Sequence, residues 1–80
     1  MNWRKRIAID SAIHHGKPCI KGTRVPVSVI VGSIAEGHSV ERIIESWPQL
    51  TADDIRAALK FAAEVVANAD VTMANGDDGG

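Results

Sequence analysis

The chain has 80 residues, enough for one small domain rather than two. Its single cysteine, Cys19, excludes an internal disulfide, and its three histidines lack the C-x-x-C partner of a zinc site. We expect a cytoplasmic protein, because no signal-peptide segment follows the charged start and no stretch approaches the roughly 20 apolar residues that cross a membrane. A core of this size stabilises a fold by only roughly 3–5 kcal/mol, so we also expect a homodimer or a bound partner.

The formal net charge is −1, but the charges are unevenly distributed. Residues 25–80 carry three basic and nine acidic residues. Residues 1–24 carry one acid and six basic residues: Arg4, Lys5, Arg6, Lys17, Lys21 and Arg24. Such a basic segment binds nucleic acid or an acidic protein in some proteins. In others it is simply a solvated terminus.

The first predicted element is a short β-arm. Residues 7–9 alternate in a strand-like pattern, and residues 11–16 are typical of a turn or a single helical turn. Glycine and proline then break any helix over residues 16–24. Within that stretch, Cys19 and Ile20 are expected to form a second short strand that returns beside the first.

Residues 25–36 fit two patterns. The alternating valines at positions 25, 27, 29 and 31 indicate a strand, which β-branched residues also favour. The spacing of Val27, Ile30, Val31 and Ile34 indicates a helix, which Gly37 would end with a positive φ. The pattern alone favours the helix by a small margin.

Two further helices are marked more clearly. Ser39 is a suitable N-cap for a helix whose apolar residues repeat at helical spacing until Pro48 ends it. Thr51 caps a third helix, with Asp54 at the position of a capping-box acid. The apolar stripe of this third helix predicts that it continues to about residue 67.

Together these elements predict a mainly α fold in three parts. They are an N-terminal β-arm at residues 1–24, a trihelical core at residues 25–67 and a disordered acidic tail at residues 68–80. The helices are expected to form the core. The short connection over residues 47–51, between the second and third helices, is the outline of a helix-turn-helix domain.

The stretch HGKPCIKGTRVPV, residues 15–27, combines glycines, a threonine and cations, as phosphate-binding loops do. Its spacing does not match G-x-x-x-x-G-K-[ST] between a strand and a helix, so we expect no nucleotide site. Lys17, Lys21 and Arg24 either contact an anion or are solvated side chains on a glycine-rich bend.

No catalytic or metal site is expected. Cys19 lies near His14 and His15 in the sequence, but a thiol within a short strand is expected to be buried and inert. Asp53 and Asp54 lie in the first turn of a helix, where acids stabilise the helix dipole. We therefore predict a non-enzymatic protein without a cofactor, a metal ion or a small-molecule substrate.

DNA binding and protein binding are two alternatives for the helices. If the third helix enters a major groove, it presents Thr51, Arg56 and Lys60. Asp53 and Glu64 on the same face balance its positive charge, so DNA affinity would depend on the cations of the N-terminal segment. Taken alone, the residues favour a protein-interaction module that never touches DNA.

A partner surface would draw on large apolar residues at the edges of the helices. The candidates are Trp47 at the end of the second helix, and Phe61 and Val65 at the edge of the third helix's stripe. Burial in the core is the commoner fate of such residues.

Three motifs resemble the small bacterial family catalogued as domain-of-unknown-function family 433. They are G-K-P-x-I-K-G-T-R-[IV]-P-V at residues 16–27, A-x-G-x-S at residues 35–39 and P-x-L-T-x-[DE]-[DI] at residues 48–54. The likeness covers about residues 7–66 and leaves out the tail and the first five residues.

The resemblance implies a homeodomain-like helix-turn-helix fold with an N-terminal β-arm, usually dimeric, in which residues 25–36 are helical. It also implies the antitoxin of a toxin–antitoxin pair, which binds its own operator DNA and masks a PIN-like, ribonuclease-type toxin encoded alongside. It carries over no catalytic residue. The candidate DNA-binding residues are then Lys17, Lys21, Arg24, Thr51, Arg56 and Lys60. A protein-interaction module without DNA binding is the alternative.

Overall fold

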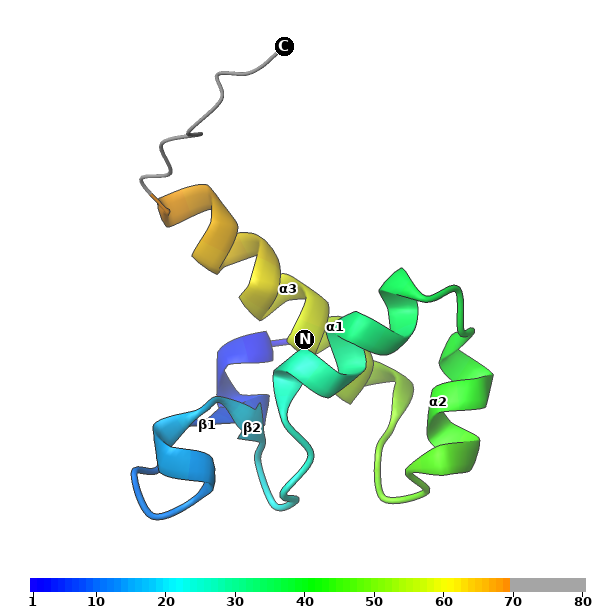
Figure 1. The fold of residues 1–80 in the computed structure, drawn as a ribbon, viewed down its shortest axis with the longest axis horizontal. Helices are drawn as coiled ribbons and strands as arrows, with labels where there is room; N and C mark the ends of the chain where they lie inside the picture. The colour runs from blue at the N-terminus through cyan, green and yellow to red at the C-terminus, as the bar shows by residue number, and fades with distance from the viewer. Residues whose placement is uncertain (70–80) are drawn as a thin grey trace, which may run out of the picture.

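The computed structural model describes residues 1–69 and contains two 3-10 helices, two short strands and three α-helices (Figure 1). In chain order the elements are η1 (Trp3–Arg6), β1 (Ile7–Ala8), η2 (His14–Gly16), β2 (Cys19–Ile20), α1 (Val27–Ala35), α2 (Val40–Ser46) and α3 (Ala52–Asn68). This confirms the predicted mainly helical fold of three helices with a short two-stranded sheet near the N-terminus.

The two strands pair as predicted. They are antiparallel, with Ile7 opposite Ile20 and Ala8 opposite Cys19. The first strand ends sooner than the alternation of residues 7–9 suggests, because Asp10 begins a turn by accepting a hydrogen bond from the Ala12 amide at 2.9 Å. Both strands lie within residues 1–24, so the sheet folds this segment back on itself.

Residues 25–36, for which two patterns competed, form α1. The helix prevails over β-branched propensity because its spacing places Val27 and Ile30 in the core, with Val31 and Ile34 packed against it. Gly37, with φ of 94°, follows the end of the helix, as its predicted role at the C-terminus requires.

The predicted caps of α2 and α3 are confirmed. The Ser39 hydroxyl accepts a hydrogen bond from the Arg42 amide at 3.1 Å. The Thr51 hydroxyl accepts from the Asp54 amide at 3.2 Å, and the Asp54 carboxylate accepts from the Thr51 amide at 3.0 Å, which completes a capping box. Helix α3 ends at Asn68, so residue 68 is helical and not part of the predicted tail. Residues 70–80 of that tail lie outside the described residues.

The helices contribute to the core, as expected, but the segment before α1 contributes to it as well. Ile20 and Val25, from the segment before α1, are 1% and 2% exposed and pack in the same cluster as the helix residues. Helix η1 also lies against α3, where Trp3 meets Phe61 edge-on with ring centroids 6.2 Å apart. The N-terminal segment is thus part of the folded unit because its apolar side chains complete a core that three short helices do not fill.

An ion pair joins the N-terminal segment to the start of α3. The Arg6 guanidinium donates to Asp54 at 3.0 Å and lies 3.6 Å from Asp53. Asp54 is 8% exposed, whereas the Arg6 side chain is 37% exposed, so the pair joins a buried carboxylate to a partly solvated guanidinium. The same carboxylate therefore caps α3 and anchors the segment that precedes β1.

Candidate functional site

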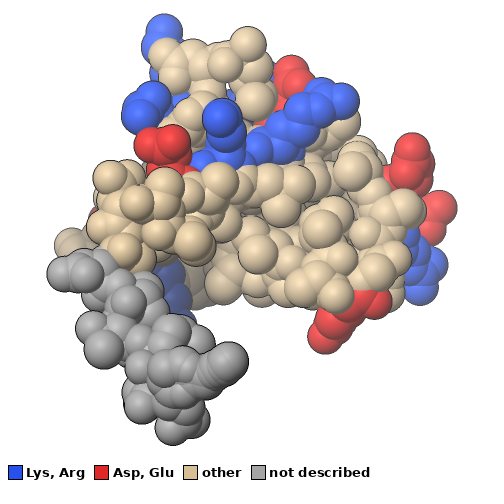
Figure 2. All heavy atoms as spheres, turned by 90° about the horizontal axis from the view of Figure 1, so that it is seen from above, with Lys and Arg blue, Asp and Glu red and all other residues tan. Residues whose placement is uncertain are grey.

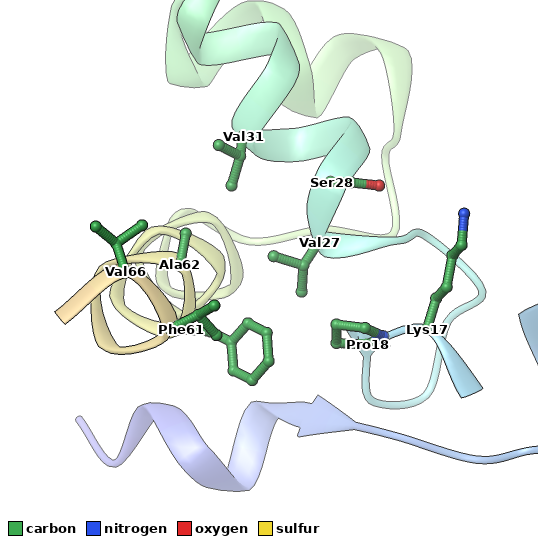
Figure 3. Close-up of a pocket in the computed structure, with 9 residues that line it drawn as sticks. Lys17, Pro18, Val27, Ser28, Val31, Phe61, Ala62 and Val66 are labelled. Carbon is green, nitrogen blue, oxygen red and sulfur yellow. The ribbon is translucent and has the colours of Figure 1, made fainter. Parts of the chain in front are cut away.

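An apolar groove lies between α1, α3 and the segment before β2 (Figure 3). Its volume is about 370 Å³. It is lined by Lys17, Pro18, Val27, Ser28, Val31, Phe61, Ala62, Val65 and Val66. Figure 3 shows the Phe61 ring directed into this groove, with the Lys17 ammonium group pointing away from the ring. Apart from Lys17 and Ser28, every lining residue is apolar.

The rim of the groove exposes apolar side chains. Val65 is 52% and Val66 is 73% exposed to solvent. The cause is geometric, because the last turns of α3 extend beyond the other helices (Figure 1). The apolar stripe of α3 begins in the core at Ile55 and continues past the point where α1 covers it. Exposed apolar side chains gathered around one groove make it a candidate binding surface.

A second apolar hollow lies on the other side of Phe61. It has a volume of about 370 Å³ and is lined by Trp3, Arg4, Ile7 and Ile9 in addition to Phe61. Ile9 is 63% exposed. Phe61 is therefore half-buried between two hollows, which places one aromatic side chain at the centre of the apolar surface.

The three predicted partner-binding residues are not brought together. Phe61 and Val65 share the groove, as their spacing on one helix allows. Trp47 packs against the core at the end of α2 and lines a different hollow of about 190 Å³, together with His38 and Arg42. Sequence reasoning missed Val66, which belongs to the same apolar stripe but carries no sign of whether another element covers it.

The predicted DNA-binding residues fall into two groups. Lys17, Lys21 and Arg24 are exposed on two loops that flank β2. A hydrogen bond joins the loops, since His14 Nε2 donates to the Arg24 carbonyl at 3.0 Å. None of the three cations has an ion-pair partner among residues 1–69.

The second group lies on α3 and is electrically balanced. The Thr51 hydroxyl is engaged as the helix cap. The Arg56 guanidinium donates to Asp53 at 2.8 Å, and Arg6 pairs with the two acids of the same turn. Lys60 is exposed and forms no ion pair within the part of the chain that the structure describes. The first turns of α3 therefore present little net positive charge to a phosphate.

Charged side chains are unevenly spread over the surface. In the space-filling view, Lys and Arg gather along one side of the molecule, and a broad band beside them carries no charge (Figure 2). The separation is not complete, because Lys17 is one of the residues that line the apolar groove.

The thiol and the histidines do not meet. Cys19 is 3% exposed, and its Sγ donates weakly to the Lys17 carbonyl at 3.5 Å. The His14 ring is occupied with the Arg24 carbonyl. Among residues 1–69, no group of three or more His, Cys, Asp and Glu side chains is placed to hold a metal ion. No helix in the same range is long and apolar enough to span a membrane.

Comparison with known proteins gives a family and a fold. The family model described as "Protein of unknown function (DUF433)" matches residues 7–62. The uncharacterized protein y4eO of Sinorhizobium fredii (strain NBRC 101917 / NGR234) is 53% identical over 59 residues, which are 74% of this chain and 27% of that protein. The chain thus spans about a quarter of the length of that relative.

A solved structure has a similar fold. The crystal structure of a DUF433 member protein from Anabaena variabilis ATCC 29413 superposes with a TM-score of 0.72 at 27% sequence identity. The match covers 78% of this chain and 61% of that one. The three motifs quoted from the sequence lie inside the range of the family model.

Proposed function

The chain belongs to the DUF433 family of proteins of unknown function, and we propose that this member is a non-enzymatic, antitoxin-like protein. In this proposal it masks a PIN-like toxin through its apolar groove and binds operator DNA through its exposed cations. The two proposed surfaces adjoin at Lys17, which lines the groove and is also one of the exposed cations.

The uncovered groove is the observation that supports toxin binding. Protein interfaces are centred on well-packed aromatic and aliphatic anchors that lose their water on binding. Phe61, Val65 and Val66 offer such anchors within two turns of one helix. Lys17 is the one titratable side chain among the lining residues, so the groove is better suited to burying a partner's apolar side chains than to acid–base chemistry.

DNA binding has weaker support and a direct rival. The charge balance at the start of α3 favours an interaction module that never touches DNA. The cations of the two loops, which have no ion-pair partner among residues 1–69, favour a nucleic-acid contact. The salt dependence of DNA affinity separates a DNA-binding protein from a protein-interaction module. For each phosphate that the protein neutralises, the logarithm of the DNA affinity falls by about 0.9 for every tenfold rise in salt concentration.

The antitoxin role predicts suppression of a ribonuclease. A gene for a PIN-like protein should neighbour the gene for this chain, and an equimolar amount of this chain should suppress that protein's cleavage of RNA. Cleavage is followed with a fluorescent RNA, and heat-denatured chain serves as the control. Undiminished cleavage in the presence of excess folded chain would exclude the masking role.

A further inference from the structure

The start of α3 is poorly suited to contacting DNA, although a helix-turn-helix domain would use this helix for recognition. Its two acids are engaged, Asp53 with Arg56 at 2.8 Å and Asp54 with Arg6 of η1 at 3.0 Å. Breaking these pairs would leave two carboxylates facing the phosphates. A DNA contact must therefore use other cations if it exists.

The loops on either side of β2 are held in a defined arrangement. In the second loop, the Thr23 hydroxyl donates to the Ile20 carbonyl at 2.8 Å and accepts from the Val25 amide at 3.1 Å. The hydrogen bond from His14 to the Arg24 carbonyl then joins the first loop to the second. Lys21 and Arg24 therefore lie on a turn whose backbone is held by these hydrogen bonds. A turn that is already ordered loses less conformational entropy when its side chains bind a ligand.

The first loop has an unusual backbone. His14, His15 and Gly16 have φ values of 50°, 57° and 85°, so two histidines adopt the left-handed conformation that favours glycine. His14 is compensated by its hydrogen bond to Arg24. The His15 side chain is exposed and forms no hydrogen bond or ion pair with any residue from 1 to 69. Backbone strain of this kind clusters at functional sites.

We propose that the loops at residues 14–17 and 21–24 form a binding site for the phosphate backbone of duplex DNA, with His15 as a contact beside Lys17, Lys21 and Arg24. The inference rests on the DNA-binding part of the proposed function. The imidazole N–H of His15 donates to a phosphate oxygen, and the three cations neutralise the phosphates. Asp10, the acid of the N-terminal segment, is occupied with the Ala12 amide.

A site of this kind fixes position without selecting sequence. Phosphate contacts orient a protein on DNA, whereas base edges in the grooves carry the sequence information. Because α3 is balanced by its own acids, the isolated chain should bind unrelated duplexes with similar affinity. Selection of an operator would then come from the arrangement of several chains or from the partner.

The test measures fluorescence anisotropy with two labelled duplexes of unrelated sequence between about 50 and about 200 mM salt. The loop variant is Lys17→Ala/Lys21→Ala/Arg24→Ala, and the matched helix variant is Arg56→Ala/Lys60→Ala. The third variant is His15→Gly, which relieves the left-handed backbone while it removes the imidazole. Circular dichroism monitors the fold and thermal midpoint of each.

Three cations predict a log–log slope of about −2.7 for the wild type, which is a loss of roughly 40-fold in affinity over this salt range. The loop variant should lose most of that slope, and the helix variant should bind within about twofold of the wild type. The His15→Gly variant should bind DNA more weakly with an equal or higher thermal midpoint, a combination that a purely structural role does not produce.

Two results would overturn the inference in different ways. In the first, the helix variant loses DNA affinity while the loop variant keeps it, or one duplex is strongly preferred over the other. The proposed loop site would then be wrong, but operator binding would stand. If the wild type binds neither duplex at about 50 mM salt, the loop site and the DNA-binding part of the proposed function both fall. Suppression of the PIN-like ribonuclease is measured separately and decides the masking role in either case.

Discussion

Replacing Asp54 with alanine should destabilise the fold by about 2–3 kcal/mol, a large part of what a core of this size supplies. The change removes the acid of the capping box, which accepts from the Thr51 amide at 3.0 Å. It also leaves Arg6 without its buried partner at 3.0 Å. The Arg6 side chain is 37% exposed, so solvent moderates the second effect, and the expected value lies below that of a fully buried pair.

Urea denaturation followed by circular dichroism measures this effect. Asp53→Ala is the matched control, because Asp53 is the neighbouring acid and its carboxylate pairs on the surface with Arg56 and Arg6. That control should cost less than about 1 kcal/mol. Asp54→Asn retains an oxygen for the Thr51 amide and should fall between the two. Equal losses for Asp53→Ala and Asp54→Ala would show that the pair of Arg6 and Asp54 does not anchor the N-terminal segment.

Replacing Val66 with aspartate should weaken binding of the PIN-like toxin by at least about 100-fold while leaving the chain folded. Val66 is 73% exposed in the isolated chain, so a carboxylate there stays hydrated and the free energy of unfolding changes little. In a complex that covers the groove, the same carboxylate would be buried against apolar walls without a counter-charge, which costs several kcal/mol. Isothermal titration calorimetry measures the affinity.

The control for that variant introduces the same charge elsewhere. Val29→Asp places a carboxylate on an exposed valine of α1 that does not line the groove. It should bind the toxin like the wild type. If both variants bind the toxin normally, the groove is not the toxin site. If both lose toxin affinity, the loss reflects added charge or altered folding and does not identify the groove as the site.

The sequence predicted the local elements well because their signals are local. The caps at Ser39 and Thr51 and the glycine after α1 act within one helical turn, so their residues can be recognised without a structure. The pairing of residues 7–8 with 19–20 was also expected, since a turn-rich stretch joins two short apolar runs. Residues 25–36 could not be decided by pattern, because burial against other elements selected the helix.

The long-range features could not be predicted from the residues. Arg6 and Asp54 are 48 positions apart, and Arg6 looked like one more cation of a basic arm. The periodicity of α3 places Val65 and Val66 on its apolar face. Whether another element covers them depends on the lengths and packing of α1 and α2, and no element among residues 1–69 does. The left-handed backbone at His14 and His15 has no sequence signal beyond the glycine that follows.

Hydrogen–deuterium exchange, with and without the PIN-like protein, tests most directly whether the groove is the partner site. In the isolated chain the last turn of α3, residues 65–68, should exchange quickly, because it extends beyond the other helices and its valines are exposed. Binding should slow exchange there and over the start of α1, and should leave α2 and Trp47 unchanged. Slowed exchange confined to α2, or no change over residues 65–68 in a formed complex, would contradict the account.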